Sequence, residues 1–283
     1  MTATRPIAGP AAVPHPAGRL RTENATIGYD RTVVCRDLTV SVPPRSFTAI
    51  IGPNGCGKST LLRALARVLR PSSGQILLDD RPIGSYRTKE VARTIGLLPQ
   101  SSIAPDGIRV ADLVARGRAP HQSLVQQWRP EDEAAVADAL AATRLNEIAG
   151  KLVSELSGGQ RQRAWVAMLL AQQTSIMLLD EPTTFLDIAH QYELLQLLRN
   201  LRRDGKTVVT VLHDLNQAAR YADHLIVMDD GRIDTAGSPT EVLTTEMVER
   251  VFGLRALIVP DPATGTPTVV PLDPEAAAPN AEG

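Results

Sequence analysis

The stretch from Gly52 to Thr60, Gly-Pro-Asn-Gly-Cys-Gly-Lys-Ser-Thr, determines the fold predicted for this 283-residue chain. It matches the phosphate-loop pattern G-x-x-x-x-G-K-[ST]. The apolar residues 47–51 before it predict a buried strand, and the leucines and alanines of residues 61–69 after it have helical spacing. A glycine loop between a strand and a helix directs backbone N–H groups toward a phosphate chain. The stretch therefore predicts a nucleoside-triphosphate site.

The side chains of this loop have separate expected roles. Lys58 supplies a positive charge for the outer phosphates, and the hydroxyl of Ser59 can bind Mg²⁺. Cys56 stands at an unspecified position of the pattern, where we interpret it as a tolerated small residue in preference to a redox switch. The residues expected to contact the nucleotide are Gly52, Pro53, Asn54, Gly55, Cys56, Gly57, Lys58, Ser59 and Thr60.

The composition limits the class of protein. The chain carries 30 Lys and Arg against 31 Asp and Glu and only 3% aromatic residues, so we expect no nucleic-acid partner. The chain contains no run of about 18 apolar residues, so no membrane span is predicted. The N-terminal residues lack the apolar core of a secretory signal, and the two cysteines, Cys35 and Cys56, show no metal-binding spacing. A reducing, cytoplasmic setting is therefore expected.

The hydrophobic pattern predicts an α/β core with two additions. Residues 22–42 and 75–83 alternate like antiparallel strands, which predicts a β subdomain near the N-terminus. Residues from about 101 to 160 are mostly helical by pattern, and we interpret them as a helical subdomain inserted into the core. Residues 241–252 are expected to form one further helix.

Proline and alanine are concentrated at both ends of the chain. Residues 1–18 are expected to form a disordered tail, and residues 261–283 a flexible C-terminal tail. The nucleotide-binding domain is therefore expected to span residues 19–260.

Two adjacent acids follow a predicted strand. Asp180 and Glu181 come directly after the apolar run Ile176–Leu179. Because ligands bind at the carboxyl ends of strands in α/β sheets, Asp180 is expected to hold Mg²⁺ beside Ser59. Glu181 is expected to orient or deprotonate an attacking water. The alternative is a solvated strand end, which the preceding buried strand and the phosphate loop make the less favoured interpretation.

Two more polar residues end predicted strands. His213 follows an apolar strand and is expected to contact the γ-phosphate; the alternative is a structural or surface histidine. Gln100 ends another strand, where its amide would reach the metal or its water. Taken alone, Gln100 is a weak signal.

Leu156-Ser-Gly-Gly-Gln160 predicts a second anion site. Ser157 is a plausible helix cap, so simple helix initiation is one interpretation. Gly158 and Gly159 weaken a helix, however, and are useful where another molecule approaches the backbone closely. One chain with two phosphate-binding helix ends indicates a head-to-tail dimer with each nucleotide between two copies.

Together these segments resemble the ATP-binding cassette ATPases in order and spacing, across roughly residues 20–260. The resemblance implies a P-loop NTPase (RecA-like) core with an N-terminal antiparallel β subdomain and an inserted helical subdomain. It implies that Tyr29 stacks on adenine and that Asp187 couples the two sites of the dimer. It also implies that Ser157, Gly158, Gly159 and Gln160 of one copy close the ATP site of the other. Phe185 departs from the small residue common in that loop.

A narrower resemblance links the chain to ATPases of bacterial iron-chelate (siderophore) importers, relatives of the vitamin B12 and haem importers. It rests on residues 52–60, 113–121, 160–168 and 180–187. It implies ATP and Mg²⁺ as ligands, transmembrane permease subunits as partners, and indirectly a substrate-binding protein. It places the chain at the cytoplasmic face of the membrane, with residues 116–121 in the subdomain that meets the permease. No residue provides a physical route to iron, so the substrate rests on resemblance alone.

Three rival functions remain at this point. A DNA-organising cassette ATPase is disfavoured because Leu156 follows Lys58 by only 98 positions, which leaves no room for the long coiled coil of that class. A ribosomal cassette ATPase is disfavoured because that class usually carries two cassettes in one chain, and this chain has one. A P-loop kinase would lack the stretch Leu156–Gln160. An exporter ATPase of the same fold is disfavoured only by the narrower resemblance.

Overall fold

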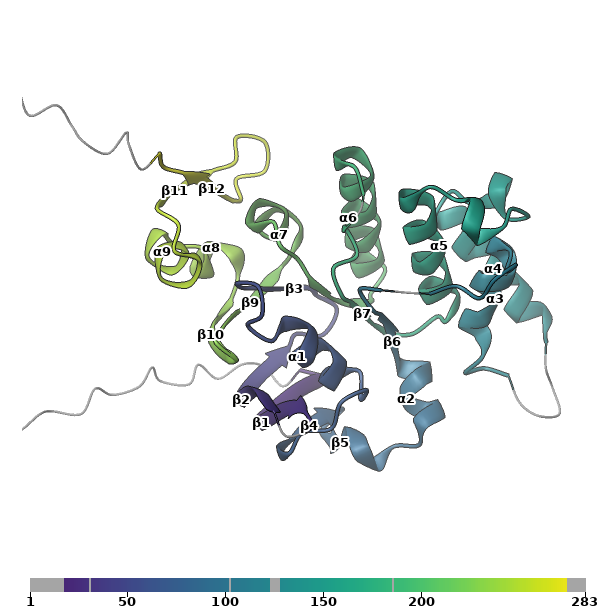
Figure 1. Cartoon of the computed structure of the whole chain (residues 1–283), viewed down its shortest axis with the longest axis horizontal. Coiled ribbons are helices and arrows are strands. Elements are labelled where there is room, and N and C mark those ends of the chain that lie inside the picture. Colours follow the sequence, from purple (N-terminus) through teal and green to yellow (C-terminus); the bar gives the residue numbers. More distant parts are fainter. Residues whose placement is uncertain (1–17, 31, 102, 123–127, 185, 274–283) are drawn as a thin grey trace, which may run out of the picture.

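The computed structural model describes residues 18–273 apart from residues 31, 102, 123–127 and 185 (Figure 1). At its centre is a six-stranded sheet with the strand order β10-β9-β3-β8-β7-β6. The strands from β9 to β6 pair in parallel, and β10 pairs with β9 antiparallel. The strands are β3 (Phe47–Ile51), β6 (Ile95–Leu98), β7 (Ile176–Leu179), β8 (Thr207–Val211), β9 (His224–Asp229) and β10 (Arg232–Gly237).

The central sheet is covered on both faces, which explains its continuous apolar strands. Every residue of β3, β7 and β8 is buried. Alternate residues face opposite cores: Ile50 packs with the leucines of α1 (Lys58–Leu65), whereas Ala49 and Ile51 pack on the other side. A strand buried on both faces has no need for alternating polar residues. The predicted buried strand and helix around the phosphate loop are therefore confirmed.

A four-stranded antiparallel sheet, ordered β2-β1-β4-β5, packs against α1 on the side away from the central sheet (Figure 1). This arrangement confirms the predicted N-terminal β subdomain. Residues 81–98 return the chain from it to the edge of the central sheet. The elements are β1 (Leu20–Tyr29), β2 (Thr32–Val42), β4 (Ser73–Leu78), β5 (Arg81–Pro82), the 3₁₀ turn η1 (Ile83–Ser85) and α2 (Thr88–Thr94).

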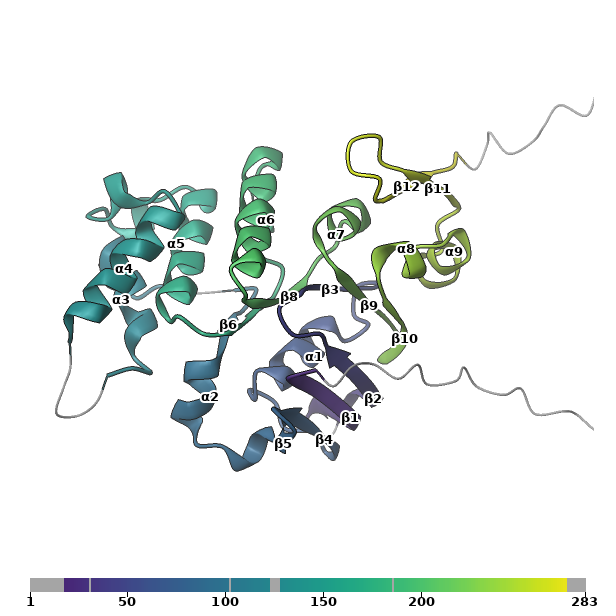
Figure 2. The ribbon, with the colours of Figure 1, turned by 180° about the vertical axis from the view of Figure 1, so that it is seen from behind.

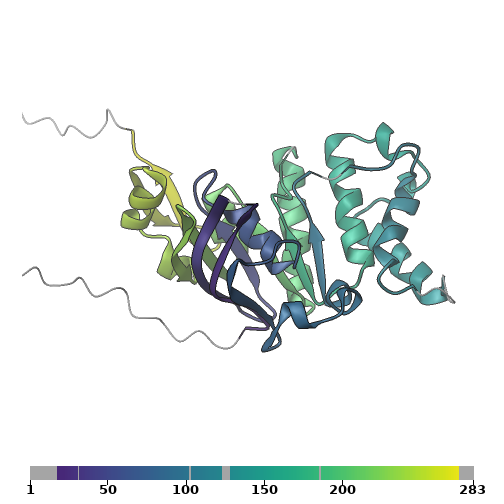
Figure 3. The same ribbon diagram turned by 60° about the horizontal axis from the view of Figure 1, so that its bottom comes forward.

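The predicted helical subdomain is confirmed and lies beside the β6 end of the sheet (Figure 3). Its helices α3, α4 and α5 contact one another, and α5 also contacts β6. Its elements are α3 (Val110–Ala115), η2 (Arg116–Arg118), α4 (Pro130–Ala142), η3 (Asn146–Ile148), η4 (Val153–Glu155) and α5 (Gly158–Ala171).

Arg118 is buried within this subdomain, inside the stretch for which the resemblance to importer ATPases implies a membrane partner. Its Nε donates to Asp132 Oδ1 at 2.7 Å, and both side chains are about 5% exposed or less. Its Nη1 donates to the carbonyl oxygen of Ala171 and to Gln173 Oε1. Arg118 therefore ties η2 to α4 and to the end of α5, and it is not available at the surface, whereas Arg116 is exposed.

Replacing Arg118 with Met is expected to lower the free energy of unfolding by about 3–5 kcal/mol, because it leaves the Asp132 carboxylate buried without its cation. Urea denaturation measures this loss. Arg144→Met is the matched control, since Arg144 pairs with Glu193 while 76% exposed, and its loss should stay below about 1 kcal/mol. Equal losses in the two variants would show that the buried pair has no special role in stability.

The C-terminal part places α6 (Ile188–Arg203) and α7 (Leu215–Tyr221) over the face of the sheet opposite α1 (Figure 2). The single helix expected over residues 241–252 is instead two helices, α8 (Pro239–Val242) and α9 (Thr245–Phe252). The break occurs because Thr244 adopts an extended backbone and its side chain caps α9 by accepting from Met247 N.

The expected C-terminal tail also differs from the structure. Strand β12 (Pro267–Pro271) pairs antiparallel with β11 (Ala256–Pro260), so residues 261–273 are ordered as a hairpin. Asn216 of α7 holds this hairpin: its Nδ2 donates to Val269 O, and its Oδ1 accepts from Val269 N. The rest of that tail, residues 274–283, and nearly all of the N-terminal tail lie outside the described residues. Within the described part of the chain, no helix is long and apolar enough to cross a membrane.

Candidate functional site

The phosphate loop connects β3 to α1, and two of its glycines are required by its shape. Gly52 and Gly57 have φ values of 150° and 102°. A Cβ atom at Gly52 would lie 2.1 Å from the carbonyl oxygen of Met228, and one at Gly57 would lie 2.5 Å from Cys35 Sγ. The loop therefore tolerates only glycine at these two positions. It runs close against β9 and β2, which fixes its path.

Lys58 reaches back across this loop. Its Nζ donates to the carbonyl oxygens of Gly52 and Pro53, both at 2.8 Å, and the residue is only 5% exposed. The ammonium group is therefore held at the base of the loop. The cavity beside it has a volume of about 170 Å³ and is lined by Val34, Asn54, Gly55, Gly57, Lys58, Ser59, Thr60, Glu181 and His213.

Ser59 and Asp180 meet at the carboxyl ends of β3 and β7. Ser59 Oγ donates to Asp180 Oδ1 at 2.8 Å, although the residues are 121 positions apart. Asp180 is 1% exposed, and its Oδ2 has no hydrogen-bond partner among the described residues. Burial raises the pKa of Asp180 above its ordinary value. A hydroxyl beside a buried carboxylate oxygen without a partner is a donor set that suits Mg²⁺.

Glu181 lies at the centre of a polar cluster. Its Oε2 accepts from Gln100 Nε2 at 2.6 Å and from Thr184 Oγ1 at 3.3 Å, and its Oε1 lies 2.6 Å from His213 Nε2. Its backbone is left-handed, with φ of 51°, which is unusual for a residue other than glycine. The side chain is 12% exposed, whereas His213 is 46% exposed. The structure thus brings Gln100, Glu181 and His213 together; Thr184 carried no signal in the sequence.

Cys56 is buried at 5% exposure in the same loop, and Cys35 of β2 is fully buried. Burial raises the pKa of Cys56 and raises the pKa of Cys35 to about 12. A raised pKa lowers the fraction of reactive thiolate. These surroundings favour the interpretation of Cys56 as a small packing residue.

Tyr29 lies at the end of β1, next to α1. Its hydroxyl accepts from Arg63 Nη1 at 3.1 Å, and the residue is 39% exposed. An exposed ring held at one end by a hydrogen bond presents a flat face for stacking. Arg63 is a second contact that the sequence did not indicate.

Ser157 and Gln160 form a reciprocal cap at the start of α5. Ser157 Oγ accepts from Gln160 N, and Gln160 Oε1 accepts from Ser157 N. Gly158 lines a separate cavity of about 270 Å³, together with Gln100 and other residues. This cavity and the one at the phosphate loop have no lining residue in common. Within one copy, the residues from Ser157 to Gln160 therefore do not enter the phosphate-loop cavity.

Asp187 caps the start of α6. Its Oδ1 accepts from His190 N at 2.9 Å, and its carboxylate also contacts His190 Nδ1 at 2.7 Å. The hydrogen bond from the His190 backbone, together with that from its ring, lowers the pKa of Asp187. Its side chain is 66% exposed, so the carboxylate is accessible at the surface. Phe185 lies outside the described residues.

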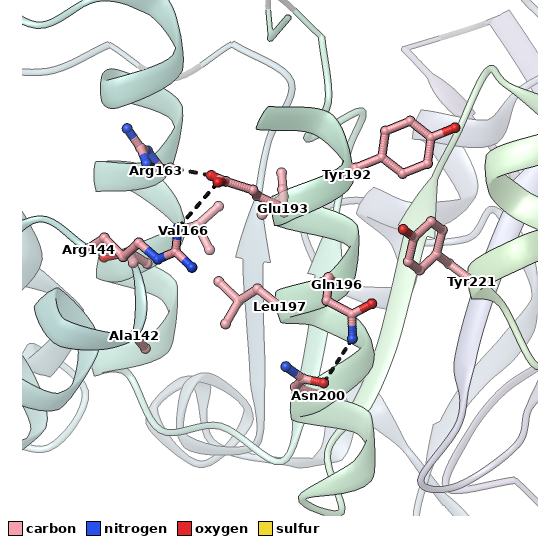
Figure 4. A pocket seen from close by; sticks show the side chains of 12 residues that line it. Ala142, Arg144, Arg163, Val166, Tyr192, Glu193, Gln196, Leu197, Asn200 and Tyr221 are labelled. Atoms are coloured by element: carbon pink, nitrogen blue, oxygen red, sulfur yellow. Dashed lines mark hydrogen bonds and ion pairs between the residues drawn. The ribbon is translucent and has the colours of Figure 1, made fainter. Parts of the chain in front are cut away.

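A third cavity, of about 450 Å³, lies between α5, α6 and the end of α7 (Figure 4). Glu193 projects toward it and pairs with Arg144 and Arg163 of the helical subdomain. None of the residues predicted for the nucleotide site lines it. The polar cluster around Glu181 is therefore separate from the largest of the three cavities.

The sequence profile of the family described as "ABC transporter" matches residues 35–184. The chain belongs to the ABC transporter family. Two relatives extend the match. The ferric enterobactin transport ATP-binding protein FepC of Escherichia coli is 57% identical, over 90% of this chain and 94% of its own. The probable siderophore transport system ATP-binding protein YusV of Bacillus subtilis is 49% identical, over 89% and 92%.

Solved structures agree with this membership. A transporter described as of metal-chelate type, in an inward-facing conformation, superimposes with a TM-score of 0.78 at 29% identity, over 91% of this chain and 99% of its own. A dimeric ATP-binding cassette, MJ0796, bound to ADP and phosphate, superimposes with a TM-score of 0.69 at 26% identity, over 77% and 98%. The chain is thus an ATP-binding ATPase with the predicted P-loop NTPase core.

Proposed function

We propose that this chain is the ATP-hydrolysing subunit of a bacterial importer for iron–siderophore complexes. The reaction is supported by one observation above all: the Glu181 carboxylate is held between Gln100 and His213, beside the Ser59–Asp180 pair. The transported substrate is supported by the similarity to the ferric enterobactin and siderophore ATP-binding proteins.

ATP binding is assigned to the phosphate loop and Tyr29. The backbone N–H groups of residues 54–60 and the Lys58 ammonium bind the phosphates, because an α-helix N-terminus and a fixed cation favour negative charge. The Tyr29 ring stacks on the adenine. Ser59, Asp180 and Gln100 are the residues that would hold Mg²⁺, which supplies further positive charge against the phosphates.

Hydrolysis is assigned to Glu181 as the general base. Its carboxylate orients a water and accepts its proton as the oxygen attacks the γ-phosphorus. The bond from this phosphorus to the β–γ bridging oxygen breaks, and ADP leaves with that oxygen. Gln100 and His213 hold the carboxylate from two sides, at 2.6 Å each. His213 also contacts the γ-phosphate. Most of the acceleration in such a reaction comes from positioning and charge neutralisation, which these fixed groups supply.

A second copy of the chain completes the site. Ser157, Gly158, Gly159 and Gln160 of one copy close over the γ-phosphate in the other, and Asp187 couples the two sites. Their separation from the phosphate-loop cavity within one copy supports this assignment, as does the dimeric state of the related cassette. The isolated chain is expected to bind ATP well and to hydrolyse it slowly unless it dimerises.

The dimer acts on transmembrane permease subunits at the cytoplasmic face of the membrane. Dimer closure moves the permease through the segment after Gln100, and hydrolysis resets it. A substrate-binding protein acts indirectly, by delivering the chelate to the permease. No nucleic acid takes part in this proposal.

Transport by the complete complex tests this function. The chain and its permease are reconstituted in vesicles with radiolabelled ferric catecholate, ferric hydroxamate or haem. ATP-dependent uptake of one ferric chelate, absent with Glu181→Gln, is the expected result. Uptake of haem alone would show that the substrate is haem and not an iron–siderophore complex. Export of the substrate would indicate an exporter. ATP hydrolysis that no permease affects would indicate a non-transport ATPase.

A further inference from the structure

Two glutamines join the helices that begin directly after the site. Gln217 lies in the first turn of α7 and is only 7% exposed. Its Nε2 donates to Gln191 Oε1, on α6, at 2.7 Å. An amide buried to this degree requires a hydrogen-bond partner, and Gln191 is the partner that the structure provides.

Gln191 continues the connection toward Asp187. Its Nε2 donates to the carbonyl oxygen of Leu186 at 3.1 Å, and its backbone N–H donates to the carbonyl oxygen of Asp187 at 2.9 Å. Both ends of its side-chain amide are therefore in use, which fixes its orientation. A Cβ atom at Gly159 would lie 3.4 Å from Leu186, so the same segment also touches the start of α5.

Gln217 is tied just as closely to His213. The carboxylate of Asp214, the residue after His213, accepts from the backbone N–H groups of Asn216 and Gln217 at 2.8 and 3.0 Å. The backbone that carries His213 is thus part of the cap of α7. A continuous path of hydrogen bonds leads from there through the two glutamines to the peptide group joining Leu186 and Asp187.

We propose that Gln191 and Gln217 are positioning residues for ATP hydrolysis, and that their amide bridge holds the segment at Asp187 in register with His213. This inference rests on the roles proposed for Glu181, His213 and Asp187. When a second copy engages Asp187, the bridge transmits the displacement of that segment to α7. His213 is thereby kept at the Glu181 carboxylate, which it contacts at 2.6 Å.

The test compares steady-state ATP hydrolysis by the full chain with its permease in four single variants and one double variant, in which Gln191 and Gln217 are both replaced by Met. Gln217→Met and Gln191→Met each keep the side-chain length and remove the bridge. Gln196→Met is the matched control on the same helix, since the hydrogen bond from Gln196 Nε2 to Asn200 Oδ1 stays within α6 (Figure 4). Gln191→Glu keeps the acceptor for Gln217 and removes the donor to Leu186.

Gln217→Met and Gln191→Met are each expected to lower kcat about five- to tenfold, the effect of losing one hydrogen bond that positions a group acting in the transition state. KM should change less than about twofold, because ATP binding does not use the bridge. The double Met variant should lose no more than the larger single loss, because both changes break one bridge. Gln191→Glu should also have a lower kcat. Because this variant keeps the acceptor for Gln217, its loss would assign the lower kcat to the hydrogen bond with Leu186. The cooperativity of hydrolysis with respect to ATP concentration should fall together with kcat in the variants that break the bridge. Gln196→Met should retain both the cooperativity and kcat.

Unchanged kcat in Gln217→Met, an equal loss in Gln196→Met, or losses that multiply in the double variant would each overturn the proposal. A loss that disappears when kcat is expressed per folded molecule would assign the bridge to stability alone and also overturn it. Glu181→Gln is measured in parallel. If it stays active, the assigned base is wrong; if it is inactive while the bridge variants are normal, only the positioning role is wrong.

Discussion

Glu181→Gln is expected to lower ATP turnover by about a hundredfold to ten thousandfold, the range that general-base catalysis contributes. The amide keeps the shape of the side chain and can still contact Gln100 and His213, but it cannot accept the proton of the attacking water. ATP binding should remain, because the phosphate loop and Ser59 are unchanged. The variant should therefore accumulate as an ATP-bound dimer.

Phosphate release at saturating ATP measures the turnover, and light scattering with and without ATP measures the dimer. Glu193→Gln is the matched control, since Glu193 is a partly exposed glutamate that pairs with Arg144 and Arg163 and lies outside the phosphate-loop cavity. Its turnover should stay near that of the unchanged chain. Near-normal hydrolysis by Glu181→Gln would show that another group activates the water.

Lys58→Ala is expected to weaken ATP binding by roughly tenfold to a hundredfold, the effect of losing one hydrogen bond to a charged group. The loss has two sources in the structure. The ammonium charge for the phosphates disappears, and the bonds from Nζ to the carbonyl oxygens of Gly52 and Pro53, which hold the loop, are removed. Titration with a non-hydrolysable ATP analogue measures the affinity.

Lys151→Ala serves as the control for this variant, because Lys151 is exposed and is not among the residues that line the phosphate-loop cavity. Its affinity for the analogue should be unchanged. Thermal unfolding of both variants shows whether Lys58→Ala is still folded. If a folded Lys58→Ala protein binds the analogue as tightly as the unchanged chain, the proposed phosphate contact is wrong.

Local signals in the sequence are sufficient for the centre of the fold. The runs that form β3, β7 and β8 are apolar apart from threonines because both faces of the sheet are covered, and the structure buries every residue in them. The prediction failed where local composition and tertiary packing conflict. Proline-rich residues after Asp261 predict a tail, but they form a hairpin, which the side-chain amide of Asn216 holds through two hydrogen bonds to the backbone of Val269.

The positions of the candidate site residues were predictable for the same local reason. Asp180, Glu181, His213 and Gln100 each follow an apolar strand, and the carboxyl ends of parallel strands share one edge. Their partners were not predictable. Thr184 and Arg63 contact Glu181 and Tyr29 through side-chain hydrogen bonds. The direction in which such a side chain points does not follow from strand or helix spacing.

The chain's own sequence was enough to specify a glycine loop, the strand and helix around it, and the polar residues at neighbouring strand ends, because each depends on backbone geometry over a few residues. The strand order β3-β8-β7-β6 lies beyond such local rules. Only that order brings Ser59 to Asp180 across 121 positions, and Gln191 to Gln217 between two helices. Contacts of this kind depend on how whole elements pack, so they exist only once the tertiary structure has formed.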